Sequence, residues 1–239
     1  DIKKKYPTMK LVSIEQNLNF ALGNNVGFSY AKYDTCVFLN NDTYVTSGWL
    51  DALILPLKND PQIKAVQPAL YYPDGTIQCI GVVFSEKSAL GYPIYAHKQK
   101  NIIKSRAFQA ITGACLAIRS SDFADLKGFS PRYVNGQEDV DLCLRLIKSK
   151  GGVCFCAAEA TVYHDESKTP GRGKYILNNR RTFIDTWQDD IRPDDNKYYK
   201  EDGYTIKEWK VDSEVARQEG VEAYIPVLVK RSARKGVKE

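Results

Sequence analysis

Three carboxylates stand within four residues at the start of a segment whose apolar residues recur at helical spacing. They are Glu138, Asp139 and Asp141, and the apolar positions continue to residue 147. Aspartate is unfavourable inside a helix but favourable at its N-terminus, where free N–H groups and the positive end of the dipole lie. The pattern therefore predicts a helix that opens near Asp139 and ends at the glycine pair 151–152.

This arrangement suits a general base. Asp139 can lie at the rim of a cleft while Leu142 and Leu146 hold the helix on a core. A carboxylate fixed in that way can take a proton from a substrate. The alternative is an acidic capping segment without any chemistry.

A continuous apolar run, T-C-V-F-L, spans residues 35–39 and has the length and character of a buried parallel strand. It ends in Asn40, Asn41 and Asp42. Because α/β sheets bind ligands beyond the carboxyl ends of their strands, this polar cluster is a candidate site for a metal or a diphosphate. Mg²⁺ and Mn²⁺ prefer such oxygen ligands. The alternative is a turn in which Asn and Asp satisfy the backbone.

The remaining elements follow from periodicity and from turn residues. Helices are predicted over 17–33, 48–58, 121–126 and 175–191. Strands are predicted over 10–14, 63–72, 76–84, 108–119, 153–158 and 161–164, with a hairpin turn at 73–75. Residues 85–107 are expected to form a loop that acts as a flap, and residues 192–204 are expected to be irregular.

The chain has two histidines, and His164 closes an apolar run next to Asp165. An imidazole there could complete a metal site with Asp42, although a structural histidine is the alternative. A loop, G-R-G-K, follows at 171–174 and could close over a phosphate through Arg172. That last signal is weak by itself.

Composition narrows the functional classes. Hydrophobic residues make up 43% of the chain and charged residues 26%, as in globular proteins. The net charge of +5 comes from the two basic ends, which argues against nucleic-acid binding. Those ends are interpreted as solvated tails, with peripheral contact to acidic lipid headgroups as the alternative. The six cysteines lie in apolar runs without metal-ligand spacing, which indicates buried reduced thiols in a cytoplasmic protein.

Seven motifs carry a resemblance to a known family. In chain order they are N-L-N-F-A-L-G-N-N-V-G-F, F-L-N-N-D-T, Y-Y-P-D-G-T-I-Q-x-x-G-V-V-F, T-G-A-C-L-A-I-R, G-F-S-P-R-Y, G-Q-E-D-V-D-L-C-L-R and V-Y-H-D-E-S-K-T. Together, over about residues 10–190, they resemble the inverting family 2 glycosyltransferases of GT-A fold, particularly bacterial rhamnosyltransferases and polysaccharide-assembly enzymes. The resemblance implies an α/β fold in which a mixed sheet is flanked by helices.

The resemblance also implies chemistry. A UDP-, dTDP- or GDP-sugar donor would be held through Mn²⁺ or Mg²⁺, and the sugar would pass with inversion to a hydroxyl of a glycan or lipid-linked acceptor. Asp42 and His164 match metal ligands, with Asn40 in place of a first aspartate, so metal affinity is expected to be lower. Asp139 matches the catalytic base, and Glu138 is the runner-up. The donor and acceptor would be bound by Asn24, Asn40, Asn41, Thr112, Gly113, Ala114 and Arg172.

The start of the chain departs from the family pattern. Members normally begin with a strand, a helix and a second strand whose final aspartate grips the nucleotide base. Residues 10–12 correspond to a later strand, so the expectation is an N-terminally incomplete GT-A domain over 1–190. Either the chain is a fragment, or another chain supplies the base site, or donor binding has been lost. Residues 191–239 are expected to form a C-terminal extension that packs on the domain or is partly flexible.

Two other functions remain open at this point. A non-catalytic glycan-binding or scaffold protein could keep the GT-A fold without transferring a sugar. A metal-dependent hydrolase of nucleotide sugars would use the same pocket and would release the sugar without an acceptor. Asp42, Asp139 and His164 occurring together favour the transferase.

Overall fold

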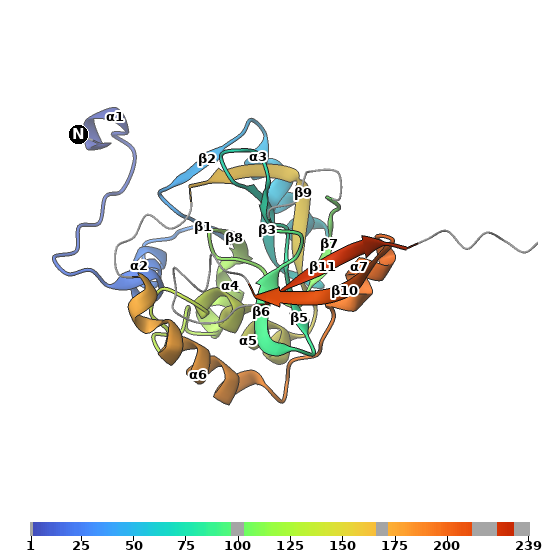
Figure 1. The fold of residues 1–239 in the computed structure, drawn as a ribbon. Helices are drawn as coiled ribbons and strands as arrows, with labels where there is room; N and C mark the ends of the chain where they lie inside the picture. The colour runs from blue at the N-terminus through green and yellow to red at the C-terminus, as the bar shows by residue number, and fades with distance from the viewer. Residues whose placement is uncertain (1, 97–102, 166–171, 212–223, 232–239) are drawn as a thin grey trace, which may run out of the picture.

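A computed structural model of the chain describes residues 2–96, 103–165, 172–211 and 224–231 (Figure 1). Its centre is a mixed sheet with the strand order β1-β8-β3-β9-β2. These strands are β1 (Thr35–Leu39), β2 (Thr43–Val45), β3 (Ile63–Tyr71), β8 (Cys115–Arg119) and β9 (Val153–His164). Strands β3 and β9 are parallel, and the other neighbours in this order are antiparallel. Two short strands, β4 (Ile77–Cys79) and β7 (Arg106–Phe108), pair with β3 and β9.

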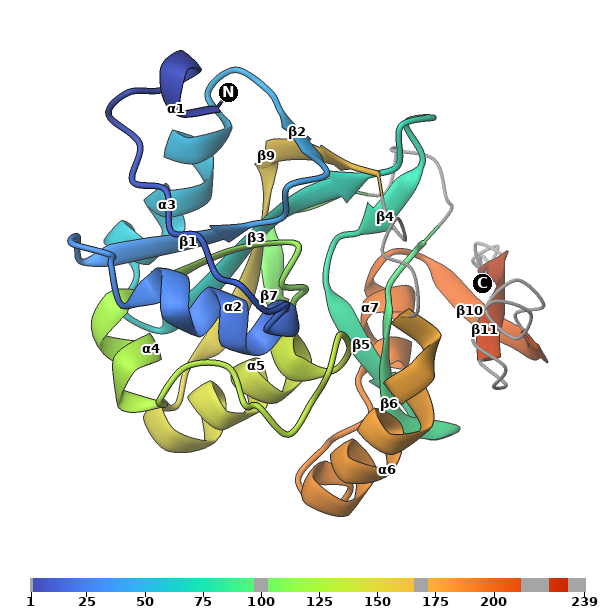
Figure 2. The same cartoon turned by 90° about the vertical axis from the view of Figure 1, so that its left-hand side faces the viewer.

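Helices cover both faces of this sheet, as predicted. Helix α3 (Trp49–Asn59) lies on one face, and α2 (Asn19–Phe28), α4 (Ser120–Asp125) and α5 (Glu138–Lys150) lie on the other (Figure 2). Apolar side chains from both layers form one buried cluster, in which the rings of Phe38, Phe123 and Phe129 contact one another. Among the described helices, none is long and apolar enough to cross a membrane.

Smaller elements surround the central layers. They are α1 (Ile2–Lys5), β5 (Val82–Ser85), β6 (Ser88–Pro93), η2 (Arg172–Tyr175), α6 (Ile176–Trp187), α7 (Asp195–Glu201), β10 (Tyr204–Val211) and β11 (Tyr224–Lys230). Strands β5 and β6 form one two-stranded sheet, and β10 and β11 form another. Helix α7 buries Tyr198 and Tyr199 in a second apolar cluster together with Ile94.

The central sheet differs from the prediction at β1. Its bounds agree, but β1 runs antiparallel to β8, and only Phe38 among its five residues is fully buried. The segment 10–14 forms no strand, and Leu11 and Ile14 are exposed. An apolar run of strand length gives no information about the direction of its neighbours, because those neighbours are distant in the sequence.

Several boundaries were also predicted wrongly. The strand over 76–84 is two strands, because Gly81 has φ +132° and the Phe108 ring packs where its Cβ would be. The segments 153–158 and 161–164 form one strand, β9. The presumed loop 85–107 contains β6 and part of β7, and the presumed irregular segment 192–204 contains α7. Strand 108–119 is interrupted, so that residues 112–114 lie between β7 and β8.

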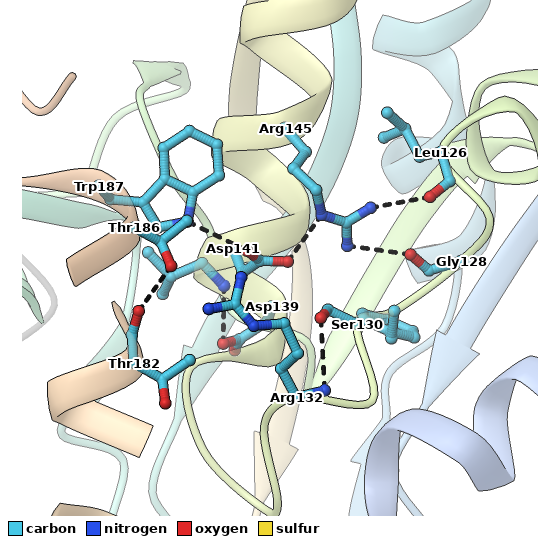
Figure 3. A network of polar contacts seen from close by, with 12 residues as sticks. Leu126, Gly128, Ser130, Arg132, Asp139, Asp141, Arg145, Thr182, Thr186 and Trp187 are labelled. Carbon is cyan, nitrogen blue, oxygen red and sulfur yellow. Dashed lines mark hydrogen bonds and ion pairs between the residues drawn. The ribbon is translucent and has the colours of Figure 1, made fainter. Parts of the chain in front are cut away.

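Helix α5 opens at Glu138, as the acidic cluster predicts, and Asp141 fastens it to its surroundings. The buried Asp141 carboxylate accepts hydrogen bonds from Arg145 Nε at 2.7 Å and from Trp187 Nε1 of α6 at 3.0 Å (Figure 3). The Arg145 guanidinium also donates to the carbonyls of Leu126 and Gly128, each at 2.9 Å. Asp141 is therefore a structural residue that ties α5 to α6, while its partner Arg145 ties α5 to the chain after α4.

Replacing Arg145 by methionine tests this anchor. The substitution leaves the Asp141 carboxylate buried without its cation and leaves two carbonyls without a donor. Breaking a buried pair from one side is strongly destabilising, so we expect the free energy of unfolding to fall by about 3 kcal/mol in urea titrations.

Lys148→Met is the matched control one turn along the same helix. Lys148 pairs with Asp190 on the surface, where ion pairs contribute about 1 kcal/mol or less. Equal losses for the two variants would contradict an anchoring role for Arg145.

Candidate active site

Asp139 is the second residue of α5, and both of its carboxylate oxygens are held by backbone N–H groups. Oδ2 accepts from Gly113 at 2.7 Å, and Oδ1 accepts from Val140 at 2.8 Å. The side chain is half-buried. Since a carboxylate has about four acceptor positions, two such bonds fix its orientation and leave capacity for a substrate hydroxyl. This geometry is compatible with the general base predicted at Asp139.

Glu138, the neighbouring candidate, is placed differently. It is 3% exposed, and one oxygen accepts a hydrogen bond from the N–H of Gly136. Its carboxylate is therefore directed to the loop that precedes α5. Of the two adjacent acids, Asp139 is the more accessible and Glu138 shapes the local backbone.

The loop before α5 has an unusual backbone that two helices hold in place. Asn135 and Gln137 both have positive φ, +54° and +76°, which costs energy and is found where the surroundings enforce it. The Asn179 side chain of α6 accepts a hydrogen bond from the backbone N–H of Val134 at 3.1 Å and donates one to the Val134 carbonyl at 2.8 Å. From α2, the backbone N–H of Phe20 donates to Asn135 Oδ1 at 3.2 Å. Sequence reasoning missed Asn179 and Asn135.

Asp42 and His164 lie in direct contact. The pairing of β2 with β9 sets Thr43 opposite His164, which brings Asp42 Oδ1 to 3.1 Å from His164 Nε2. Asn40 Nδ2 lies 3.2 Å from the same ring nitrogen. Three residues predicted for metal or donor binding, from the end of β1 and the end of β9, thus meet at one point.

The segment 112–114 joins this cluster to Asp139. The backbone N–H of Asn40 donates to the carbonyl of Ala114 at 2.9 Å, while the N–H of the preceding Gly113 donates to Asp139. A Cβ on Gly113 would lie 3.0 Å from the Phe20 ring and 3.1 Å from the Asp139 Cβ, so a side chain there would crowd both. The predicted residues Thr112, Gly113 and Ala114 are therefore a physical link between the two halves of the site.

Two buried glutamines support this arrangement and were not predicted. Gln67 of β3 accepts the N–H of Thr112 at 3.0 Å, and its own amide donates to the carbonyls of Pro68 and Cys79. Gln78 of β4 contacts His164 twice, through the ring and through the backbone carbonyl. A lone amide inside an apolar strand is the signal that could have found them, because buried polar groups require partners.

The other predicted residues lie apart from these contacts. Asn41 is exposed at the turn between β1 and β2. Asn24 donates to the Phe20 carbonyl of its own helix at 2.8 Å, whereas its neighbour Asn25 bridges to both backbone groups of Phe129. Arg172 begins η2, but its side chain lies outside the described residues, as do His97 and residues 166–171.

Three of the buried cysteines are unsuited to nucleophilic chemistry. All six are free thiols, and five are buried, as predicted. Burial raises the pKa of Cys115 to about 12 and raises the pKa values of Cys143 and Cys156 well above the ordinary range. A thiol in that state is not a nucleophile near neutral pH.

Hydrogen bonding around His164 fits a divalent cation. Gln78 Nε2 donates to the His164 carbonyl, so Gln78 Oε1 must face Nδ1, and Nδ1 carries the proton. In the neutral ring, the lone pair of Nε2 then faces the Asp42 carboxylate 3.1 Å away. Neighbouring ligands of an octahedral ion with bonds near 2.1 Å are separated by about 3.0 Å. Within the described part of the chain, no group of three or more His, Cys, Asp and Glu residues surrounds a metal position. Asp42 and His164 are therefore the two candidate protein ligands at this site.

Comparison with known proteins identifies the family. A model described as glycosyl transferase family 2 matches residues 1–126, more than half of the chain. The chain belongs to glycosyl transferase family 2. A second model, described as the N-terminal domain of galactosyltransferase, matches residues 96–166 of this family 2 protein.

Two curated relatives illustrate the similarity. The O-antigen biosynthesis protein RfbC of Myxococcus xanthus is 30% identical over 169 residues, covering 67% of this chain and 13% of that protein. The N-acetylglucosaminyl-diphospho-decaprenol L-rhamnosyltransferase of Mycobacterium tuberculosis is 27% identical over 193 residues, covering 71% of this chain and 62% of that protein. The chain thus spans less than two thirds of the length of either relative.

Solved structures share the fold. The crystal structure of GalNAc-T7 with UDP, GalNAc and Mn²⁺ superposes with a TM-score of 0.59 at 17% identity, covering 79% of this chain and 39% of that one. The mannosyltransferase PcManGT of Pyrobaculum calidifontis, in complex with GDP-Man and Mn²⁺, gives 0.51 at 13% identity, covering 80% and 50%. The mixed sheet flanked by helices is therefore the fold of GT-A glycosyltransferases, as the sequence motifs indicated.

A pair of glycine substitutions tests how closely the segment 112–114 is packed. Gly113→Ala adds a methyl group 3.0 Å from Phe20 and 3.1 Å from Asp139, so we expect a loss of about 1–3 kcal/mol in the free energy of unfolding. Gly23→Ala, inside α2 with open space around it, should instead stabilise by about 0.5–1 kcal/mol. Urea unfolding measures both, and a neutral Gly113→Ala would show that the contact tolerates a side chain.

Proposed function

We propose that this family 2 protein is a metal-dependent inverting glycosyltransferase that moves a sugar from a nucleotide-sugar donor to a hydroxyl acceptor in glycan or polysaccharide assembly. The observation that carries the proposal is the connection of Asp139, through Gly113 and Ala114, to Asn40 beside the Asp42–His164 pair. The names of the relatives support the polysaccharide context.

Asp139 is the proposed general base. Its two backbone hydrogen bonds hold the carboxylate beside Gly113, where it would take the proton of the acceptor hydroxyl as that oxygen attacks the anomeric carbon. The new bond forms on the face opposite the departing nucleoside diphosphate, and the glycosidic bond to the diphosphate breaks. One such displacement inverts the anomeric configuration.

Asp42 and His164 are the proposed ligands of Mn²⁺ or Mg²⁺. When bound, such an ion neutralises the charge that grows on the departing diphosphate. The residues themselves supply an oxygen and a nitrogen ligand already set side by side, and Asn40 lies next to them with an amide that can contact the donor. Two protein ligands leave further coordination positions for diphosphate oxygens and water.

The substrate class follows from the relatives and remains part of the proposal. A UDP-, dTDP- or GDP-sugar would be the donor, since the two structural neighbours are complexes with UDP and with GDP-Man. A lipid-linked glycan would be the acceptor, because the rhamnosyltransferase relative is named for a diphospho-decaprenol substrate. Thr112 and Ala114 would line the acceptor side, beside the base.

Asp139→Asn is the direct test of the base. The amide cannot accept a proton, and its NH₂ group can no longer accept one of the two backbone hydrogen bonds. We expect transfer to fall 10²–10⁴-fold or more while donor affinity, measured by calorimetry, stays close to wild type. Glu138→Gln is the control and should lose much less activity. The reverse ranking would move the role to Glu138.

Metal and donor binding are tested without turnover. Mn²⁺ with UDP or GDP, present at 100 times its Kd, should stabilise the protein by about 2.7 kcal/mol and raise its melting temperature. EDTA should abolish the rise, and Asp42→Asn and His164→Ala should largely remove it. Asp51→Asn, on the exposed surface of α3, is the charge-matched control. A rise in wild type without transfer to any acceptor would favour a binding protein over an enzyme.

A further inference from the structure

Gln78 is buried beside His164 and uses both ends of its amide on that one residue. Its Oε1 lies 2.8 Å from His164 Nδ1, and its Nε2 donates to the His164 carbonyl at 3.2 Å. Gln78 and His164 are each 6% exposed, so water does not compete strongly for these groups. The amide therefore contacts the ring and the backbone of the same residue.

These two contacts determine which ring nitrogen is protonated. A carbonyl can only accept a hydrogen bond, so the NH₂ group of Gln78 must face the His164 carbonyl. The amide oxygen then faces Nδ1, which can only be satisfied as N–H. In a neutral imidazole the other nitrogen, Nε2, is left with its lone pair, and that nitrogen is the one beside Asp42 and Asn40.

We propose that Gln78 is a positioning residue that fixes the tautomer and the ring orientation of His164, so that Nε2 is presented as a metal ligand beside Asp42. The inference rests on the proposed metal-dependent function and deepens it. Partners of metal-binding histidines act in this way, and their loss commonly weakens metal affinity 10–100-fold.

The fold explains how Gln78 reaches this position. Strand β4 pairs antiparallel with β3, and β3 pairs in parallel with β9, with Leu70 opposite both Cys79 and Val162. Strands β4 and β9 therefore lie on the two edges of β3, and the contacts between Gln78 and His164 join these flanking strands across the end of β3. Ile77 and Cys79, the neighbours of Gln78, are apolar and buried. An amide between them is not required for packing.

Nitrogen-15 NMR of the imidazole ring reads the tautomer directly. The chain has two histidines, so a tag-free His97→Gln background leaves His164 as the single histidine. In that background, at a pH high enough for the ring to be neutral, we expect Nδ1 to be protonated and Nε2 to be bare in the metal-free protein. Gln78→Met removes the acceptor and the donor and should increase the Nε2–H form. Gln78→Glu keeps an acceptor for Nδ1–H, although it loses the N–H donated to the His164 carbonyl, and should keep Nδ1 protonated.

Titration of Mn²⁺ in the presence of UDP or GDP, with the free ion followed by electron paramagnetic resonance, gives the second readout. Gln78→Met should bind Mn²⁺ 10–100-fold more weakly than wild type. Gln78→Glu should bind it about as tightly as wild type, because a carboxylate is itself a common partner of ligating histidines. Ile77→Val, adjacent in β4 and buried, controls for general loosening of the strand, and melting temperatures confirm that each variant is folded.

The outcomes separate this inference from the proposed function. An Nε2–H tautomer in wild type, or an unchanged tautomer and Mn²⁺ affinity in Gln78→Met, would overturn the role of Gln78 even if the protein binds metal and transfers sugar. Failure of wild type to bind Mn²⁺ with either nucleotide would overturn the metal site, and the ligand-positioning role with it, whatever the tautomer. The expected pair of changes in Gln78→Met, with both properties kept in Gln78→Glu, supports the assignment.

Discussion

The arrangement of the site depends on one short stretch of backbone, residues 112–114, between β7 and β8. Its Gly113 N–H binds Asp139, and its Ala114 carbonyl accepts the N–H of Asn40. Neither bond involves a side chain of the segment, so the link depends on how closely the backbone approaches α5 and β1. Gly113 permits that approach, because a Cβ would meet both Phe20 and Asp139. Asp139 and the Asp42–His164 pair are thereby fixed relative to one another.

Two buried glutamine side chains support the backbone around the candidate site. Residues 112–114 lie outside regular strands, so their N–H groups need partners that a sheet would otherwise supply. Gln67 accepts the N–H of Thr112, and Gln78 satisfies His164 in a similar way on the neighbouring strand. Each glutamine side chain forms hydrogen bonds with the loop or strand end that carries the candidate site. The apolar core thus contains polar residues where the site must be attached to it.

Patterns of neighbouring residues predicted the structural features that depend on neighbouring residues, such as where a helix opens. The acidic cluster at residues 138–141 correctly predicted the opening of α5, and the apolar run 35–39 predicted β1 with its bounds. The antiparallel direction of β1 and the break at Gly81 depend on residues far away in the sequence, namely β8 and Phe108. The two buried glutamines, by contrast, could have been predicted from the sequence. Gln67 and Gln78 interrupt apolar strands, and such residues are buried only where partners exist.

The three carboxylates of α5 show why a cluster of like residues needs a structure to be interpreted. Successive residues of a helix point about 100° apart, so positions 139 and 141 face nearly opposite directions. Asp141 points to Trp187 and Arg145, which neutralises it; Glu138 contacts the preceding loop; Asp139 reaches Gly113. Because Asp141 is paired with Arg145, the start of the helix does not concentrate three uncompensated charges around Asp139. The helical repeat thus separates Asp139 from Asp141, whereas Glu138 lies on nearly the same face as Asp141 and differs from it because its carboxylate is bonded to the preceding loop.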